Sequence, residues 1–227
     1  MKELYKKTTN LILKNRFFGF TLAEVLVTLS IIGVLAAVTV PNLISSYQKT
    51  QFKVGLKKAY STLTQAIIMI EHQNGEVDAL FFRDNLKNYL KYYEELPLLI
   101  NRHKNTYKTF NNKTYVSGNL FDDYTLKHPD GTVLFVNTDN HTFPVQIYVD
   151  LNGIQKGPNR LGYDFFLVIE YGKDQNDKKY RIMGGPQTTY QNQDTYCNMK
   201  SNNDKNGLGC AFRALNDKKY WDELPIK

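Results

Sequence analysis

The sequence predicts an α+β fold in which one long N-terminal helix packs on a head that contains an antiparallel β-sheet. Three observations lead to this fold class. An apolar run covers Phe20–Val40, and a stretch with helical periodicity continues from there to about His72. The segments that alternate with a period of two are grouped after the helices, which is typical of α+β rather than of α/β proteins.

The apolar run has the length of a membrane span. Phe20–Val40 contains 21 residues, which as a helix measure roughly 31 Å, close to the thickness of a bilayer core of about 30 Å. The preceding residues 1–19 carry five Lys and Arg and one Glu, so +4 of the chain's net charge of +7 lies there. The positive-inside rule keeps such a segment in the cytoplasm and places the C-terminal bulk outside it.

Glu24 is the unusual residue of this segment. An ionised carboxylate at membrane depth costs at least a few kcal/mol unless it is paired. A secretory signal peptide fits poorly, because the apolar run is long and no small-x-small cleavage site closes it. An ordinary signal anchor remains an alternative, but it gives no reason for Glu24.

The order of a basic leader, Gly19-Phe20-Thr21-Leu22-Ala23-Glu24 and an apolar helix resembles the type III signal of the type IV pilin superfamily. This superfamily includes type IV pilins, minor pilins and the pseudopilins of the type II secretion system. The resemblance implies that a prepilin peptidase/methyltransferase cuts between Gly19 and Phe20 and methylates the new amino group of Phe20. It also implies that Gly33 and Pro41 are the places of helix flexibility and of a kink.

Cleavage would give Glu24 a partner. The new amine of Phe20 lies one helical turn away, and residues at i and i+4 face each other on a helix. In a medium of low dielectric constant this amine can pair with Glu24 of the same chain or of a neighbouring subunit. The sequence therefore predicts that Glu24 sets the register of assembly, with a tolerated polar residue near the interface as the alternative.

The resemblance and the periodicity together divide the chain into four parts. Residues 1–19 form a leader that is removed, 20–40 a transmembrane and assembly helix, 41–75 the amphipathic half of the same helix, and 76–227 a globular head. The amphipathic half carries one apolar stripe at steps of four and three, consisting of Leu56, Tyr60, Leu63, Ile67 and Ile70. We expect this stripe to pack on the head.

The head is expected to contain a second helix and then strands. The helix is expected over Asp78–Glu95, because Pro97 follows it. The strands are expected at residues 124–126 and 132–136, joined by a turn at His128–Gly131, and then at 143–150, 165–171 and 179–183. This arrangement is also what the pilin resemblance implies.

The connection between the third and fourth expected strands is rich in oxygen ligands. Residues 150–164 are similar to a loop of many prepilin-type proteins, and major pseudopilins hold calcium in a nearby loop. The resemblance makes Asp150, Asn152 and Asp164 candidate calcium ligands, although calcium prefers six to eight oxygens. The alternative is a tight turn in which both carboxylates bond to their own backbone.

The two cysteines are expected to form a disulfide. Cys197 and Cys210 are the only cysteines, and an even pair in an exported domain predicts a disulfide. Closing this loop contributes roughly 3 kcal/mol in the chain-entropy model. The resemblance agrees, because pilins often close a C-terminal loop with one disulfide.

The sequence favours a structural protein over an enzyme. The four His residues show no metal-ligand spacing, and no nucleophile or phosphate-binding motif occurs. We therefore expect a minor subunit of a type IV pilus or type II secretion pseudopilus, in the inner membrane first and in the fibre later. Its partners would be other pilin or pseudopilin subunits and the inner-membrane assembly platform.

A second interpretation is a minor pilin whose head captures DNA or a surface ligand. Removing a leader of +4 from a chain of +7 leaves only +3, so nucleic acid is a weakly supported partner. A single-pass anchored enzyme is the third interpretation, and it requires a catalytic site in the folded head.

Overall fold

The computed structural model describes residues 19–96, 107–115, 123–138, 144–172 and 177–224. The chain divides into two compact units, Met1–Ile44 and Ser45–Lys227. The helix α1 (Leu22–Asn74) contributes to both units, and each unit is described by itself.

In the first unit, the apolar part of α1 satisfies its own polar groups. The hydroxyl groups of Thr28, Ser30 and Thr39 donate to backbone carbonyls three or four residues earlier, at 2.7–3.0 Å. Pro41 lies inside the helix and does not end it. Proline removes one helical N–H donor, and the side chain of Asn42 donates to the carbonyl of Val38 at 3.2 Å one turn earlier. The three hydroxyl groups and the Asn42 amide nitrogen thus have partners within the helix itself.

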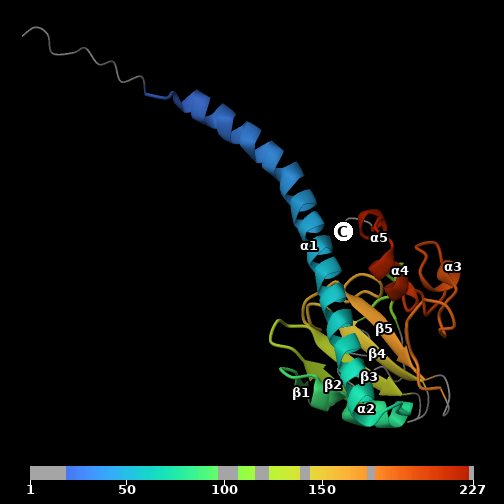
Figure 1. The fold of residues 1–227 in the computed structure, drawn as a ribbon. Coiled ribbons are helices and arrows are strands. Elements are labelled where there is room, and N and C mark those ends of the chain that lie inside the picture. Colours follow the sequence, from blue (N-terminus) through green and yellow to red (C-terminus); the bar gives the residue numbers. More distant parts are fainter. Residues whose placement is uncertain (1–18, 97–106, 116–122, 139–143, 173–176, 225–227) are drawn as a thin grey trace, which may run out of the picture. The chain divides into compact units, whose positions relative to one another are not determined.

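The second unit contains a six-stranded sheet in which all neighbours are antiparallel and follow the chain order (Figure 1). In this meander each strand pairs with the strand that precedes or follows it along the chain. Its strands are β1 (Glu94–Leu96), β2 (Tyr124–Lys127), β3 (Val133–Thr138), β4 (Val145–Asp150), β5 (Phe165–Tyr171) and β6 (Tyr180–Ile182). The five strands expected from the sequence are confirmed within about two residues at each end, and β1 is an additional one.

Helix α2 (Ala79–Tyr89) is shorter than the sequence suggests. Asp78 caps its first turn, accepting a hydrogen bond from the amide of Phe81 at 2.8 Å. The expectation that the helix reaches Glu95 is wrong. The chain turns after Leu90, whose carbonyl accepts from Tyr93 N, and residues 94–96 pair with β2. Pairing with the edge of the sheet gives these residues backbone partners that helical periodicity cannot reveal.

The sheet carries an apolar core on each face, because successive side chains of a strand point to opposite sides. On one face, the expected stripe of α1 packs with α2 and with strand residues such as Leu134 and Val136. Leu56, Leu63, Ile67 and Ile70 are fully buried there, which confirms the predicted contact between the long helix and the sheet. On the other face, Val133 and Phe135 pack with Tyr107, Phe165 and Leu208.

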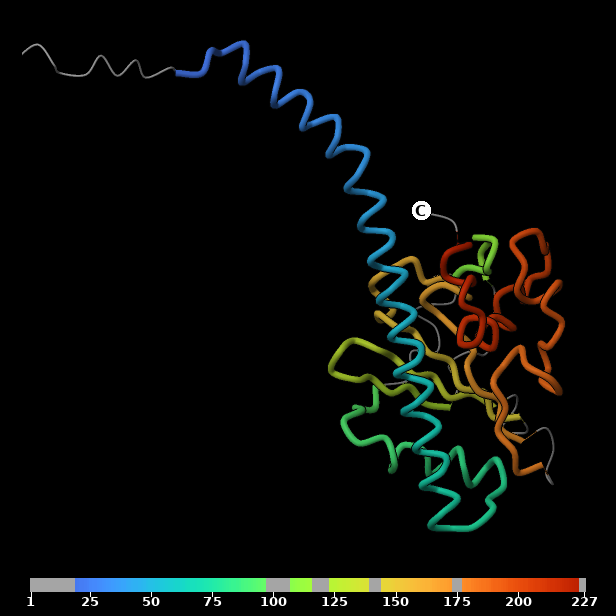
Figure 2. The backbone as a smooth tube through the Cα atoms, turned by 45° about the horizontal axis from the view of Figure 1, so that its top comes forward, coloured from blue at the N-terminus to red at the C-terminus, as the bar shows by residue number. Residues whose placement is uncertain are grey.

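The C-terminal segment forms a lobe beside the sheet, drawn in orange and red in Figure 2. It contains three short helices, α3 (Gln193–Tyr196), α4 (Cys210–Asn216) and α5 (Tyr220–Glu223). Its backbone approaches itself closely. A Cβ atom at Gly184, where φ is +86°, would lie 1.8 Å from the carbonyl oxygen of Gly209, so only glycine fits. The disulfide between Cys197 and Cys210 joins the end of α3 to the start of α4, as the sequence predicts.

Removing this disulfide is expected to destabilise the second unit. In the variant that carries Cys197→Ala and Cys210→Ala, loss of a cross-link with a sequence separation of 13 costs about 3 kcal/mol. For a domain of this size, that loss lowers the thermal midpoint by about 6–12 °C. Circular dichroism of the full chain in detergent measures the shift. A reductant should lower the midpoint of the wild type but leave the variant unchanged, and equal midpoints without reductant would contradict the prediction.

Candidate functional site

Glu24 and Thr21 form a reciprocal hydrogen-bonded pair at the start of α1. The Glu24 carboxylate oxygen Oε2 accepts from the backbone N of Thr21 and from its hydroxyl, both at 2.8 Å. In return, Thr21 Oγ1 accepts from the backbone N of Glu24 at 3.2 Å. This is a capping box, in which two otherwise unpaired helix donors are satisfied.

The capping box changes the energetic description of Glu24. The carboxylate sits in the first turn, where the helix dipole favours a negative charge, and it already has two donors within its own chain. Thr21 was not among the partners expected for Glu24, although the Thr-x-x-Glu spacing at a helix start is the signal for this motif. The carboxylate is exposed and is bound through one of its two oxygens.

The bond between Gly19 and Phe20 lies just before the helix. Gly19, Phe20 and Thr21 have no regular secondary structure, and the side chain of Phe20 is 87% exposed. A peptidase needs an accessible, non-helical backbone at the bond that it cuts, and this segment meets that requirement. Gly33 and Pro41 both lie within the continuous α1, and nothing approaches within 4 Å of a Cβ atom built on Gly33.

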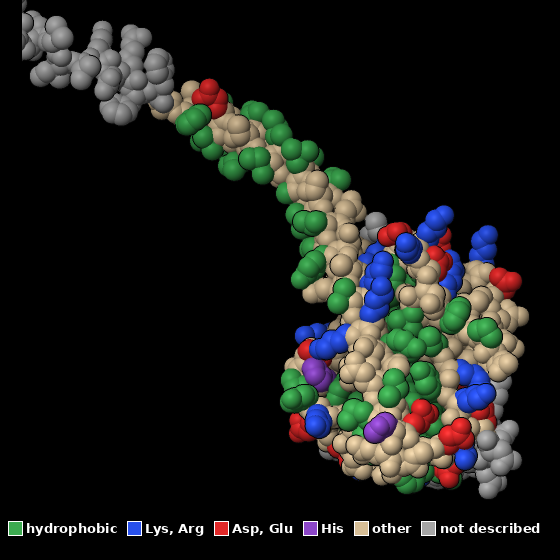
Figure 3. All heavy atoms as spheres, in the orientation of Figure 1, with side chains coloured by type: hydrophobic (Ala, Val, Ile, Leu, Met, Phe, Trp, Pro, Cys, Tyr) green, Lys and Arg blue, Asp and Glu red, His purple; other side chains and the backbone are tan. Residues whose placement is uncertain are grey.

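The apolar side chains of the first half of α1 are exposed to an unusual degree. None of the most hydrophobic 18-residue window is buried, and the helix is long and apolar enough to cross a membrane. Large side chains such as Leu22, Val34 and Val38 are 64–78% exposed. Such a continuous apolar surface indicates a contact with lipid or with another protein. Figure 3 shows hydrophobic side chains, in green, distributed along the length of this helix.

Of the candidate calcium ligands, Asp150 ends β4, Asn152 follows it in the connection to β5, and Asp164 ends that connection. Both Asp150 and Asp164 are fully buried. Asp150 accepts from the backbone N atoms of Asn152 and Gly153 at 3.2 and 2.8 Å, and from the hydroxyl of Tyr107 at 2.9 Å. The backbone N atoms of Asn159 and Arg160 donate to Asp164 at 2.9 and 2.8 Å.

These contacts correspond to the tight turn that the sequence analysis held as the alternative to calcium. Each carboxylate oxygen that would face a cation already accepts from the chain's own donors. Burial, and then the charge of Asp164, raise the pKa of Asp150 to about 7, against the lowering effect of its hydrogen bonds. Within the described ranges, no three His, Cys, Asp or Glu side chains form a metal-binding group. Calcium binding through Asp150, Asn152 and Asp164 stays a prediction.

Several hollows lie on the surface of the second unit, among them one beside the C-terminal helices and one beside α1. One of about 430 Å³ is lined by residues of α3, α4 and α5 together with Phe110 and Met199. The other, of about 640 Å³, lies between α1 residues 48–55 and the connection after β4. Neither is lined by Asp150, the carboxylate with the raised pKa.

Comparison with known proteins identifies the N-terminal signal. The family model described as the prokaryotic N-terminal methylation motif matches residues 14–40. No curated protein and no solved structure matches the chain. The matched residues contain the Gly19–Phe20 bond, the capping box and the exposed apolar part of α1 up to Val40. The chain therefore carries the prepilin-type methylation signal of type IV pilins and pseudopilins at its N-terminus, followed by a pilin-like α+β fold.

Proposed function

We propose that this chain is the precursor of a structural subunit that is cleaved after Gly19, methylated on Phe20 and assembled through its N-terminal helix. The assembly is a type IV pilus or a type II secretion pseudopilus. The observation that carries the proposal is the apolar surface of α1 before Val40, which lies within the matched methylation motif and of which nothing is buried.

That surface needs an apolar environment in two successive states. Burying one Val, Leu or Ile side chain stabilises by about 1.5–3 kcal/mol, so a helix covered with them does not remain in water. The bilayer supplies the environment for the precursor, and the same segments of neighbouring subunits supply it in the fibre. Lipid and a helix bundle are similar in polarity, so the transfer between them is not opposed by the hydrophobic effect.

Glu24 gives this transfer a direction. In the precursor, the carboxylate accepts hydrogen bonds from Thr21, its one partner among the described residues. Its second oxygen can accept a hydrogen bond from the methylated amine of another subunit. Cleavage creates this amine at Phe20, one residue before Thr21. We propose a minor rather than a major subunit, because the second unit is large, with residues 45–227, and carries the additional helix α2 after α1.

Mass spectrometry of the protein purified from the envelope of its host tests the processing step. The expected chain begins at N-methyl-Phe20 and contains the Cys197–Cys210 cross-link. In the matched variant Gly19→Val, a branched side chain beside the bond is expected to block cleavage, so that the chain begins at Met1. A wild-type chain that begins at Met1 would overturn the proposal in favour of an ordinary signal anchor.

A further inference from the structure

The charge on α1 is distributed asymmetrically. Between Glu24 and Glu71 the sequence contains no carboxylate, yet it contains four lysines, Lys49, Lys53, Lys57 and Lys58. All four lie in the second unit, on the first turns of the helix after the apolar segment. Cations this close to the far end of a membrane span act against the positive-inside rule. After removal of the leader with its five cations, the far side holds most of the flanking positive charge.

The fold uses two of these lysines. The ammonium group of Lys58 pairs with Asp130 in the turn between β2 and β3 at 2.6 Å. Lys49 Nζ donates to the carbonyl of Leu224, just after α5, at 2.6 Å, and no carboxylate of the residues that the structure describes forms an ion pair with it. Within the described ranges, neither Lys53 nor Lys57 forms an ion pair or donates a side-chain hydrogen bond.

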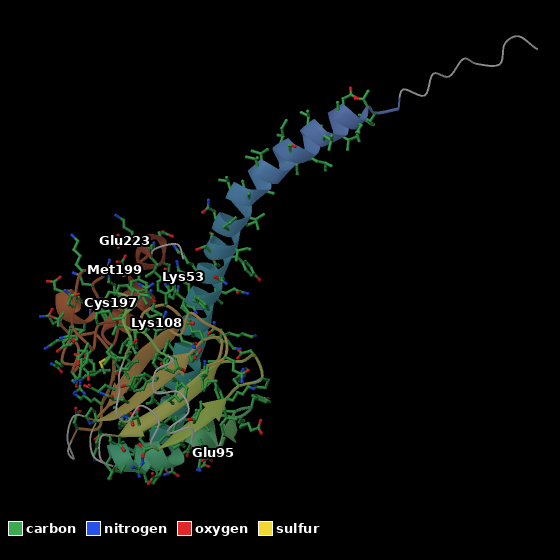
Figure 4. All side chains as sticks on the ribbon, turned by 180° about the vertical axis from the view of Figure 1, so that it is seen from behind. Lys53, Glu95, Lys108, Cys197, Met199 and Glu223 are labelled. Atoms are coloured by element: carbon green, nitrogen blue, oxygen red, sulfur yellow. A yellow bond between two sulfur atoms is a disulfide. The ribbon has the colours of Figure 1, made fainter. Side chains whose placement is uncertain are left out.

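Lys49 and Lys53 lie on one side of the helix, four residues apart. Figure 4 shows Lys53 on the side of α1 where the C-terminal helices lie, which agrees with the bond from Lys49 to Leu224. Figure 3 shows Lys and Arg side chains, in blue, beside this part of α1, with Asp and Glu side chains, in red, among those near the C-terminal helices. The ammonium groups of Lys49, which has one backbone partner, and of Lys53 therefore lie beside the C-terminal helices of the second unit.

Chain length sets how far these groups can be from a bilayer that holds the segment before Val40. Lys49 is nine residues and Lys53 thirteen residues beyond Val40, which is about 14 and 20 Å along a helix. The headgroup layer adds roughly 5–8 Å to each side of the hydrocarbon core, and the Debye length is about 8–10 Å. With their long flexible stems, both ammonium groups reach the field of charged headgroups, whereas Lys57, about 6 Å further, is at its limit.

We propose that Lys49 and Lys53 bind the anionic headgroups of bilayer phospholipids and hold the second unit against the membrane before assembly. The proposal rests on the membrane anchoring of the proposed function. Phosphate oxygens accept the ammonium protons that the fold leaves unused, and no carboxylate of α1 between residues 25 and 70 repels the lipid. Entry into the fibre would release this contact.

Amine acylation followed by mass spectrometry tests the contact. The full chain is placed in nanodiscs of phosphatidylcholine alone or mixed with phosphatidylglycerol, so that both faces of the bilayer are accessible to the reagent. We expect acylation of Lys49 and Lys53 to slow by about fivefold in the anionic bilayer. Acylation of Lys57 should slow less, and the acylation rate of Lys91, an exposed residue after α2, should not change. High salt should remove the difference.

A matched pair of variants separates lipid binding from general charge. Lys53→Gln is expected to weaken the lipid-dependent protection of Lys49, because two neighbouring cations attract the same headgroups. Lys57→Gln removes the same charge one turn further away and should leave that protection nearly unchanged. Equal effects of the two variants would overturn the proposal.

The remaining outcomes distinguish this inference from the proposed function. A chain that does not co-elute with either nanodisc overturns the membrane anchoring and the inference with it. A chain that co-elutes with both but is acylated equally in both overturns the inference alone. Protection that increases with the number of chains per nanodisc, and not with lipid charge, assigns these lysines to a subunit contact and also overturns it.

Discussion

Glu24→Ala is expected to reduce incorporation of the subunit into fibres by at least about tenfold, which corresponds to roughly 1.4 kcal/mol. Membrane insertion and cleavage after Gly19 should remain close to wild type, because the alanine variant has a more apolar span and an unchanged cleavage segment. Quantitative immunoblotting of sheared fibres against the membrane pool measures the ratio. In the low-dielectric fibre interior, an unpaired ammonium at Phe20 would cost more than the lost pair itself.

The capping box makes two matched controls available. Glu24→Gln removes the charge but keeps a side chain that can complete a capping box, so it should behave like Glu24→Ala if the pair with an amine sets the register. Thr21→Val removes the hydroxyl of the capping box, which costs the helix about 0.5–2 kcal/mol, but it leaves the carboxylate. It should be incorporated nearly as the wild type is.

The opposite pattern would contradict the register hypothesis. If Glu24→Gln is incorporated normally while Thr21→Val is not, the role of Glu24 is to start the helix. The structure makes this comparison necessary, because it gives Glu24 a local function that the isolated sequence motif conceals.

The stability of the second unit is expected to fall as the pH rises from about 4 to 8, and Asp150 is expected to be a main cause. Its pKa is raised from 3.8 to about 7 in the folded chain. The folded state therefore binds a proton that the unfolded state has released in this range. The stabilisation that this bound proton provides is fully present below the pKa that Asp150 has in the unfolded chain. It is lost as the pH rises through the pKa of Asp150 in the folded chain. A shift of about three units corresponds to at most about 4 kcal/mol.

Asp150→Asn should flatten this dependence and raise the thermal midpoint at pH 8 relative to wild type. The amide oxygen can still accept from the backbone N atoms of Asn152 and Gly153, and the amide nitrogen can donate to the hydroxyl of Tyr107, so the turn is preserved. Thermal unfolding of the full chain in detergent, followed from pH 4 to pH 8, provides the measurement. A wild-type profile that rises over this range would contradict the assignment.

Asp130→Asn is the control of opposite sign. Hydrogen bonds from Lys58 and Thr132 lower the pKa of Asp130 despite its partial burial, so its contribution is present above the unfolded pKa and is lost in acid. The thermal midpoint of this variant should lie below that of the wild type near neutral pH, and the two midpoints should become equal at low pH. Repeating the series with calcium also tests the predicted metal site, since a bound cation would raise the midpoint at pH 8 in the wild type and not in Asp150→Asn.

Patterns that depend on neighbours along the chain were predictable. The period of the stripe from Leu56 to Ile70 follows from helix geometry, and the same residues form the buried face of α1. The strands β2 to β5 have apolar residues and turn signals that are local too. Strand β1 was not predictable, because Glu94 and Glu95 have the composition of a helix end and become a strand only by pairing with β2.

The sequence by itself contained the methylation motif on which the proposed processing and anchoring rest, because Gly19, Phe20, Glu24 and the apolar run form a pattern through their order and spacing along the chain. Only the tertiary structure decided the environment of each polar group. It paired Glu24 with Thr21, buried Asp150 beside Asp164, and left Lys53 without a partner among the described residues while Lys58 found Asp130. The physical reason is that desolvation and pairing depend on residues distant in the chain, and these come together only when the sheet, the helix and the C-terminal lobe pack.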